Sequence, residues 1–499
     1  TTVPGEGWTV TSPETVGDFT AVGYYFARSV REHHPDVPIG ILHSSWGGSR
    51  IEAWLDAGAQ GLLDTDELLA AERQQIEQAQ QRVVNKLKTI YPQITTEDPG
   101  LKAEWWRTNS NWNQQEPYAY QVVPGTWEAN GYPDFDGIAW YRTSFQLTAA
   151  EAAAGVTVHL GQIDDADITW LNDQEIGRMD NAYNVDRVYE VPAALLREGK
   201  NVLTVRVEDY GWGGGFRSAA AAVFVQTAEQ KIPLAGQWQF SPGAYRVAGF
   251  AQKANKLPTL LYNAMIHPLL RCKLRGFCWY QGESNASLEA DAQKYAKQFQ
   301  SLIRWWREDW GQGDLPFLFV QLANFGPEQS LGPDDHWPTL RQSQQAALSL
   351  PNTHQALAID IGEADDIHPK NKQEVGRRLA LGARALAYGE DIAYESPRYQ
   401  SVTGEKYKLL LHFTVPSTEL SRRATLAEGV VRGFEVAGED GRFRRATAIL
   451  HQQELRIWTG GITNPRYLRY AWRQNPGPLH LYTNEGLPVA PFSVSLKKD

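Results

Sequence analysis

Several sequence features are absent or rare in this chain, and each absence excludes a class of protein or of site. Long runs of Lys or Arg are absent and the net charge is −10, which argues against nucleic acid as a partner. No apolar stretch of about 18 residues occurs, so no membrane-spanning segment is predicted. The only two cysteines, Cys272 and Cys278, flank one predicted strand. They form no zinc pattern, and a disulfide between them stays open.

A start methionine and a signal peptide are also absent, because the chain begins with TTVPGEGW. We expect either that a leader has been removed or that the front of the protein is missing. A periplasmic or extracellular location is the expectation that follows.

The 499 residues predict about three domains. Residues 1–99 and 244–390 alternate amphipathic helices with short apolar strands, which is typical of a mostly parallel sheet flanked by helices. The predicted strands include "VPIGILHSSWGG", "LRGFCWY", "LPFLFVQLANF" and "QALAIDIG". The predicted helices include one from Phe19 to Val30, a long one through "DELLAAERQQIEQAQQRVVNKL", and one that Gly389 closes.

Residues 100–243 and 391–499 have a different pattern, with short alternating runs separated by turn residues. Examples are "AWYRTSFQL", "GVTVHLGQI" and "YKLLLHFTV". Such spacing favours β-sandwiches. The predicted fold is therefore an α/β domain with a parallel sheet, interrupted by a jelly-roll β-sandwich and followed by a small C-terminal β-sandwich.

Three predicted strand ends carry polar residues of chemical interest: "HSSWGGSRIEAW", "WYQGESNA" and "DDIH". The carboxyl ends of strands are where α/β sheets gather their sites. In the last segment Asp365 precedes His368 by three residues, and a histidine held by a carboxylate is a general base for a nucleophile. Each segment alone is more often a tight turn or a helix cap, but the three together indicate a site.

Taken together, these segments resemble the SGNH-type hydrolases and, more narrowly, the sialate O-acetylesterase family of carbohydrate esterases. The resemblance is carried in order by "FTAVGYYFAR", "PIGILHSSWGGSRIEAW", "LYNAMIHPLL", "RGFCWYQGESNA", "IDIGEADDIHPKNKQEVGRRLA" and "LRYAW…LYTNEGLPVAPF". The inserted β segment resembles the sugar-binding-like jelly roll found inside the esterase domain of this family. The implied fold is an SGNH-hydrolase-like sheet.

The resemblance also implies roles for particular residues. It makes His368 the base and Asp365 its orienting carboxylate. The N–H of Gly48, with Gly47 as the alternative, would donate to the oxyanion. Gln281, with Asn285 as the second candidate, would supply the side-chain donor. Such donors stabilise the negative charge of ester cleavage without a metal, and neither a metal nor an organic cofactor is implied.

The nucleophile of the family is a serine in a Gly-Gln-Ser-Asn-Met-type segment, and no Gly-Gln-Ser occurs in this chain. We therefore expect the serine to lie outside these 499 residues, on a separate amino-terminal segment that would be a partner of the chain. Ser284 half-mimics a Gly-x-Ser-x-Gly elbow but lacks the second glycine, because Ala286 follows. Ser45 and Ser49 are weaker candidates that more simply cap the turn.

The predicted function is a carbohydrate O-acetylesterase that acts by Ser-His-Asp acyl transfer on an O-acetylated sugar or glycan. The sequence leaves open which sugar carries the ester. One alternative is a non-catalytic carbohydrate-binding protein with a degenerate esterase domain. Another is a glycoside hydrolase, which needs two facing carboxylates; Glu283 and Asp365 are the pair available.

Overall fold

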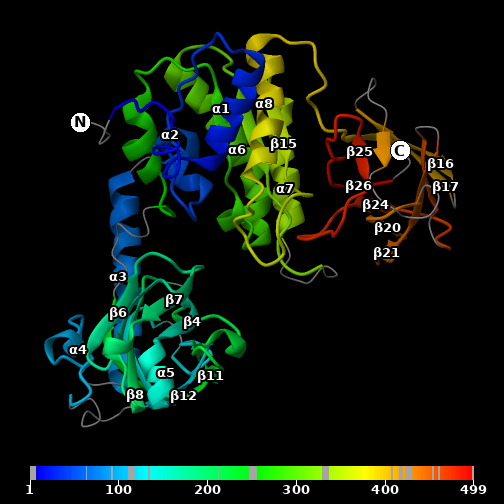
Figure 1. Ribbon diagram of the computed structural model, residues 1–499. Helices are drawn as coiled ribbons and strands as arrows, with labels where there is room; N and C mark the ends of the chain where they lie inside the picture. Colours follow the sequence, from blue (N-terminus) through cyan, green and yellow to red (C-terminus); the bar gives the residue numbers. More distant parts are fainter. Residues whose placement is uncertain are drawn as a thin grey trace. The chain divides into compact units, whose positions relative to one another are not determined.

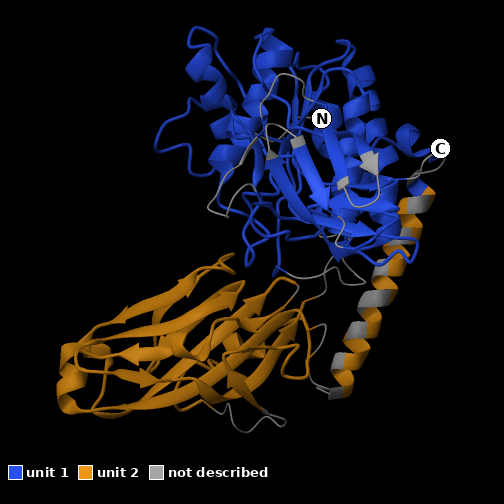
Figure 2. Ribbon diagram, turned by 90° about the vertical axis from the view of Figure 1, so that its right-hand side faces the viewer, with its two compact units in different colours: residues 1–66, 254–499 blue, residues 67–253 orange. Residues whose placement is uncertain are grey.

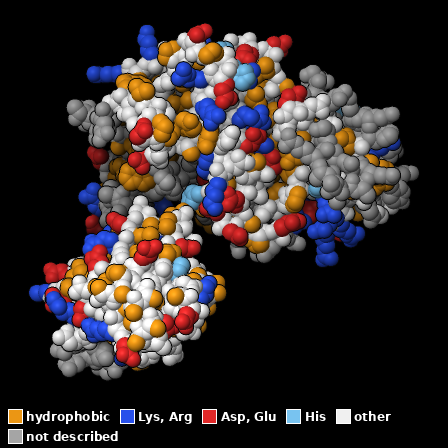
Figure 3. Space-filling model, viewed as in Figure 1, with side chains coloured by type: hydrophobic (Ala, Val, Ile, Leu, Met, Phe, Trp, Pro, Cys, Tyr) orange, Lys and Arg blue, Asp and Glu red, His pale blue; other side chains and the backbone are white. Residues whose placement is uncertain are grey.

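The computed structural model divides the chain into two compact units, residues 1–66 with 254–499 and residues 67–253 (Figure 2). The structure describes residues 7–62, 65–90, 94–110, 119–132, 135–211, 213–246, 255–328, 336–405, 408–414, 420–422, 430–451, 454–458 and 461–496. Each unit is described by itself below. Charged side chains of both signs are interspersed on the face drawn in Figure 3.

The first unit is built on a parallel sheet, which within the described residues has three strands in the order β13-β14-β15. Its strands are β13 (Phe277–Trp279), β14 (Phe317–Gln321) and β15 (Thr353–Leu357). Its helices are α1 (Ala21–His33), η1 (Ile51–Trp54), α2 (Ala57–Gln60), η6 (Tyr262–Ile266), η7 (His267–Leu269), η8 (Glu283–Asn285), α6 (Glu289–Trp310), α7 (Trp337–Gln345), η9 (Ala346–Ser349) and α8 (Lys372–Tyr388). The parallel strands predicted for residues 257–390 are confirmed.

Alternation along the buried strands explains the layers of this sheet. On β14, Phe317 and Phe319 pack with the core of α6, whereas Leu318 and Val320 pack with the core of α1 and α8. Successive strand residues face opposite sides, so both faces of the sheet carry helices. Figure 1 shows α8 lying beside α1. The two helices approach closely at Gly376, where a Cβ atom would lie 2.6 Å from the backbone nitrogen of Phe26.

The prediction of a strand at "VPIGILHSSWGG" is wrong. Residues 38–46 form no strand or helix in the structure. Ile41 packs near Gly23 of α1, and Ser44 donates to the carbonyl of Met265 at 3.0 Å, so the segment is held by contacts other than a sheet ladder. Leu42 and Trp46 are exposed. An apolar run reads as a strand in a sequence, but it becomes one only when another strand pairs with it.

The C-terminal part of the first unit is β-rich and has its own core around Val436, Leu455 and Tyr470. Its strands are β16 (Tyr399–Glu405), β17 (Lys408–Phe413), β18 (Leu420–Arg422), β19 (Val430–Val431), β20 (Phe434–Ala437), β21 (Arg444–Arg445), β22 (Thr447–His451), β23 (Glu454–Trp458), β24 (Tyr467–Tyr470), β25 (Leu481–Thr483) and β26 (Phe492–Ser495). Their described pairings are antiparallel, as the alternating pattern predicts. Arg341 of α7 joins this part to the α/β part, because its guanidinium donates to the carbonyl of Gln474 at 2.9 Å.

The second unit, residues 67–253, is dominated by two antiparallel sheets that share one core, including Trp127, Tyr141 and Trp238. Its strands are β1 (Ala119–Val123), β2 (Gly125–Thr126), β3 (Gly137–Leu147), β4 (Val156–Asp164), β5 (Ala166–Leu171), β6 (Gln174–Met179), β7 (Asp186–Val191), β8 (Gly199–Asp209), β9 (Gly215–Phe216), β10 (Phe224–Gln226), β11 (Lys231–Pro233) and β12 (Gly236–Tyr245). Its helices are α3 (Thr65–Ile90), α4 (Pro99–Lys102), α5 (Ala149–Ala154), η3 (Ala193–Leu195) and η4 (Ala220–Ala222). The predicted β-sandwich is thus present, and the unit also takes in most of the long helix α3.

Two smaller expectations concern the cysteines and the membrane. Cys272 and Cys278 are both free, and Cys278 lies within β13 rather than beyond it. Among the helices described, none has the length and apolar character needed to cross a bilayer.

Candidate functional site

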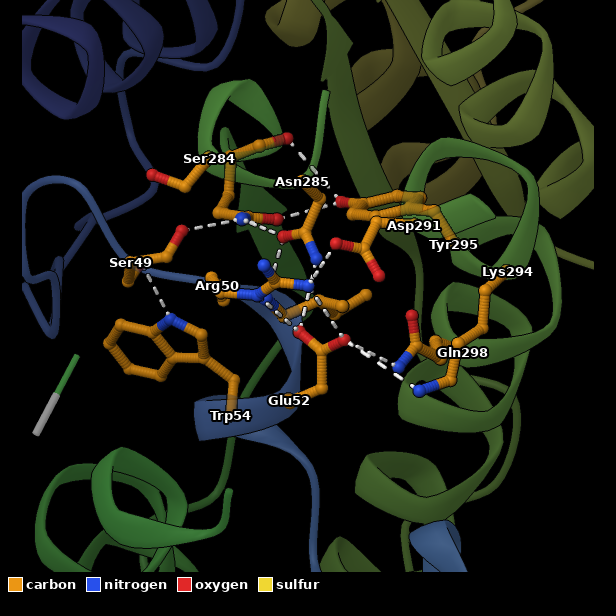
Figure 4. A network of polar contacts seen from close by, with 12 residues as sticks. Ser49, Arg50, Glu52, Trp54, Ser284, Asn285, Asp291, Lys294, Tyr295 and Gln298 are labelled. Carbon is orange, nitrogen blue, oxygen red and sulfur yellow. Dashed lines mark hydrogen bonds and ion pairs between the residues drawn. The ribbon is translucent and has the colours of Figure 1, made fainter. Parts of the chain in front are cut away.

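The candidate site begins where the turn after β13 meets the loop that leads into η1. Two amide side chains of the turn, Gln281 and Asn285, bind this loop, although the two segments are more than 200 residues apart in sequence. Figure 4 shows Asn285 of the turn together with Glu52, which follows the loop. The Gln281 Nε2 atom donates to the carbonyl of Ser49 at 2.7 Å. The Asn285 Oδ1 atom accepts from the backbone N–H of Ile51 at 2.9 Å.

The amides of this turn are buried and saturated with partners. Gln281 Nε2 also donates to Asn285 Oδ1 at 2.9 Å, and the Tyr295 hydroxyl donates to Gln281 Oε1 at 2.9 Å. Asn285 is fully buried, and its Nδ2 donates to Glu52 at 3.0 Å. Two hydrogen bonds therefore use the Gln281 amino group in this structure. Any donation from Gln281 to a reacting oxygen requires one of them to break.

Charged side chains also belong to this hydrogen-bond network. Arg50 pairs with Asp291 at 2.8 Å and contacts Glu52 at 3.4 Å. Burial raises the pKa of Glu52, but the amide of Gln298, the charge of Arg50 and the amide of Asn285 together hold it below its ordinary value. Glu52 is thus an ionised anchor that orients Asn285 and, through it, the turn after β13.

The second feature of the site is His368, in the loop between β15 and α8. Its side chain is 70% exposed. The carboxylate of Asp366 accepts from the backbone N–H of His368 at 2.8 Å and lies 3.7 Å from its Nδ1 atom. Asp365 is exposed. The structure thus brings Asp366 to the histidine, a neighbour of Asp365 that the sequence analysis did not name.

Glu283 connects the two features, because it lies close enough to His368 and Lys372 to interact electrostatically with both. Burial raises the pKa of Glu283, and a backbone hydrogen bond and the interactions with His368 and Lys372 oppose the rise. Lys372 also lies over the ring of Tyr280, 5.4 Å from its centroid. The start of α8 and its preceding loop therefore lie beside the turn after β13.

The structure places the remaining predicted residues around this junction. Gly48 is exposed and adopts a left-handed conformation with φ of 61°, which favours glycine. Its carbonyl accepts from the hydroxyl of Ser284 at 2.9 Å. Gly47 is also exposed, and its carbonyl accepts from Asn255 at 2.9 Å. Gly48, Gln281 and Asn285 are thus linked in one network, and His368 reaches its edge through Glu283.

One pair in this region escaped the sequence analysis. The Ser45 hydroxyl and the Nε2 atom of His43 are 2.6 Å apart, and both residues are exposed. Burial of part of the ring lowers the pKa of His43, and Phe19 packs edge-on against it. A serine next to a histidine is a possible nucleophile and base by geometry. The short i, i+2 spacing in "HSS" was the sequence feature that could have revealed this pair.

A polar hollow of about 640 Å³ lies elsewhere in the first unit, lined by residues of α1, α8 and the C-terminal region. Its charged groups are largely paired: Arg28 with Glu32 at 3.2 Å and Arg377 with Glu374 at 2.7 Å. Arg378 pairs with Asp360 at 2.6 Å. Because the first two pairs lie within single helices and the third joins α8 to the segment after β15, these charges have structural partners, and we place the candidate site at the strand ends and not in this hollow.

Replacing Asn285 by alanine is expected to destabilise the protein by about 3 kcal/mol. The change leaves the buried Ile51 N–H and the Glu52 carboxylate each without one partner. Thermal unfolding followed by circular dichroism measures the effect. Ser284→Ala is the matched control, because it removes one hydrogen bond in a half-buried position and is expected to cost under about 1 kcal/mol. Equal effects of the two changes would contradict the anchoring role of Asn285.

Comparisons with known proteins fit this site. Residues 236–384 match the family model described as "carbohydrate esterase, sialic acid-specific acetylesterase". Residues 103–212 match that of the "beta-galactosidase second all-beta domain". The sialate O-acetylesterase of Mus musculus is 42% identical over 267 residues, covering 48% of this chain and 47% of the relative. That of Homo sapiens is 34% identical over 262 residues, covering 47% and 48%.

A solved carbohydrate acetylesterase from Xanthomonas citri is 26% identical, with 68% of this chain and 95% of that chain covered and a TM-score of 0.46. The chain spans about half the length of the curated relatives it matches. The matched region 236–384 includes Gln281, Asn285 and His368. The similarity to the sialate O-acetylesterase family that the sequence motifs indicate is therefore confirmed over this part of the chain.

Proposed function

We propose that this chain is the base- and oxyanion-bearing part of a carbohydrate O-acetylesterase. The observation that carries the proposal is the hydrogen-bonded junction of the loop at Gly48 with the turn at Gln281, together with the position of Lys372, which follows the loop of His368, over Tyr280 at the start of that turn. Support comes from the matches to sialate O-acetylesterases, which include two of these three segments. A glycoside hydrolase would instead need Glu283 and Asp365 as facing carboxylates, and no relative reported above favours that pair.

In the proposed reaction, a serine hydroxyl attacks the acetyl carbonyl while His368 takes its proton. The tetrahedral oxyanion then collapses, the sugar oxygen leaves, and His368 returns the proton to it. Water, deprotonated by the same histidine, hydrolyses the acetyl-serine, so that acetate leaves and the serine is regenerated. The serine is the one group that this sequence does not supply in the family pattern, and we propose that it lies on an amino-terminal segment outside these 499 residues.

The proposed oxyanion donors differ in whether a hydrogen bond must break before they can donate to the oxyanion. Gly48 is exposed and needs no rearrangement of a side chain. Gln281 must release the Ser49 carbonyl or Asn285 before it can donate. We therefore propose Gly48 as the principal donor, Gln281 as the second donor after a local change, and Asn285 as the group that positions Gln281.

The proposed substrate is an O-acetylated sugar, with sialic acid as the first sugar to test because the curated relatives are named for it. The β-sandwich of the second unit is proposed to bind the glycan. Asp365 as the orienting carboxylate and a periplasmic or extracellular location stay predictions.

The test is acetate release from a panel of O-acetylated sialic acid, acetylated xylan and a small activated acetate. We expect a form of the protein that includes a Gly-Gln-Ser segment to release acetate from at least one sugar substrate without producing new reducing ends. Acetate measured by a coupled assay and reducing sugar measured in parallel separate an esterase from a glycoside hydrolase. Glycan binding without release of either product would favour the non-catalytic alternative.

A further inference from the structure

Three carboxylates gather at one end of the β-sandwich, in the second unit. Asp164 ends β4, Asp165 follows it, and Asp209 ends β8. One carboxylate oxygen from each lies within 4.8 Å of the others. None of the three takes part in the proposed ester cleavage.

Asp209 supplies the independent observation that points to a ligand. Its side chain is fully buried. The Oδ1 atom accepts from the N–H of Gly211 at 3.0 Å, whereas Oδ2 has no hydrogen-bond partner among the described residues. A buried carboxylate oxygen without a donor is costly, and it usually indicates a bound ion or water.

The positive charge near these carboxylates is smaller than the negative charge. Arg217 contacts Asp164 at 3.2 Å, but its side chain is 46% exposed. The buried Arg187 is already paired with Asp167 at 2.9 Å, and it reaches Asp165 only at the backbone carbonyl. The one buried arginine described beside the cluster is therefore already paired with a carboxylate outside it.

We propose that Asp164, Asp165 and Asp209 bind a Ca²⁺ ion that joins the end of β4 to the end of β8. The donors are all oxygen atoms, as a hard cation prefers, and no histidine or cysteine belongs to the cluster. Oxygen atoms within 4.8 Å of one another can all reach one ion at the Ca²⁺–ligand distance of about 2.4 Å, and Ca²⁺ tolerates irregular geometry, whereas Mg²⁺ demands a near-ideal octahedron and gives up its water reluctantly. The ion stabilises the β-sandwich and takes no part in the ester chemistry.

The test is thermal unfolding of the whole chain in EDTA and in increasing CaCl₂, together with a direct titration by isothermal calorimetry. We expect saturable binding of one ion with a Kd in the range of about 10⁻⁵ to 10⁻³ M, and a rise in Tm of about 5 °C at saturation. MgCl₂ is expected to bind at least about tenfold more weakly.

The Asp209→Asn variant distinguishes a metal-binding role of Asp209 from a purely structural role. In EDTA the variant is expected to be at least as stable as the wild type, because it removes an unpartnered buried charge. In CaCl₂ it is expected to lose the gain in Tm that the wild type shows. Asp186→Asn, an exposed carboxylate at the start of β7, is the matched control and should retain the full gain. The absence of saturable binding up to about 10 mM CaCl₂, or an equal Ca²⁺ response of Asp209→Asn, would overturn the proposal.

Discussion

Replacing His368 by alanine is expected to lower kcat for acetyl release by about 10⁴-fold or more in a form of the enzyme that contains the Gly-Gln-Ser segment. The resemblance assigns to this imidazole the transfer of the serine proton to the leaving sugar oxygen. It is exposed, and it interacts electrostatically with Glu283 of the turn after β13. KM is expected to change little, because the histidine acts on the transition state. Steady-state kinetics on a small activated acetate measures both constants.

His43→Ala is the control for this experiment. His43 is also exposed and contacts a serine hydroxyl, that of Ser45, at 2.6 Å. It is expected to retain most of the activity, because the resemblance assigns the base to His368. Loss of activity in His43→Ala but not in His368→Ala would transfer the role of base to the His43–Ser45 pair and contradict the proposed mechanism.

The same assay identifies the carboxylate that orients His368, by comparing Asp365→Asn with Asp366→Asn. The resemblance assigns the role to Asp365, whereas the structure gives a contact of His368 with Asp366. We expect Asp365→Asn to lower kcat more, because the resemblance gives Asp365 the orienting role and the Asp366 carboxylate already accepts from the backbone N–H of His368. The reverse order would identify Asp366 as the orienting residue.

Much of the fold follows from periodicity in the sequence. Apolar spacing of three to four residues predicts α1 and α6, and continuous apolar runs predict β13, β14 and β15. The same rule fails at residues 38–46, which carry a strand-like run but pair with no strand in the structure. A local pattern shows that a segment can form a strand, whereas pairing depends on what lies beside it.

The site is only partly predictable, for a physical reason. Gly48, Gln281, Asn285 and His368 could be singled out because their segments resemble those of the sialate O-acetylesterase family, although the strand predicted before Gly48 does not form. The hydrogen bonds of these residues could not be predicted. A sequence does not show whether an amide such as that of Asn285 contacts a substrate or a buried carboxylate such as Glu52. The acidic cluster of the β-sandwich was missed for the same reason, since Asp209 lies far in sequence from Asp164.

The second large effect concerns the 499-residue chain by itself, which is expected to release acetate at least about 10³-fold more slowly than a form that includes the Gly-Gln-Ser segment. The chain retains the proposed base and the Gly48 donor, and an oxyanion site alone gives about 10³- to 10⁴-fold acceleration over water. A small residual rate above the uncatalysed reaction is therefore expected, without a burst of covalent acetyl-enzyme. Stopped-flow measurement with 4-nitrophenyl acetate tests both points.

Two serines of the chain serve as internal controls for this expectation. Ser284 donates to the Gly48 carbonyl at 2.9 Å, and Ser45 contacts His43. If either were the nucleophile, the chain alone would show a burst and a rate comparable with the longer form, and the corresponding alanine variant would abolish both. We expect instead that Ser284→Ala and Ser45→Ala leave the residual rate within about twofold, because the family resemblance assigns the nucleophile to a serine of the Gly-Gln-Ser segment and not to Ser284 or to the Ser45 beside His43. A burst removed by Ser284→Ala would show that the turn after β13 supplies the nucleophile and that no further segment is needed for catalysis.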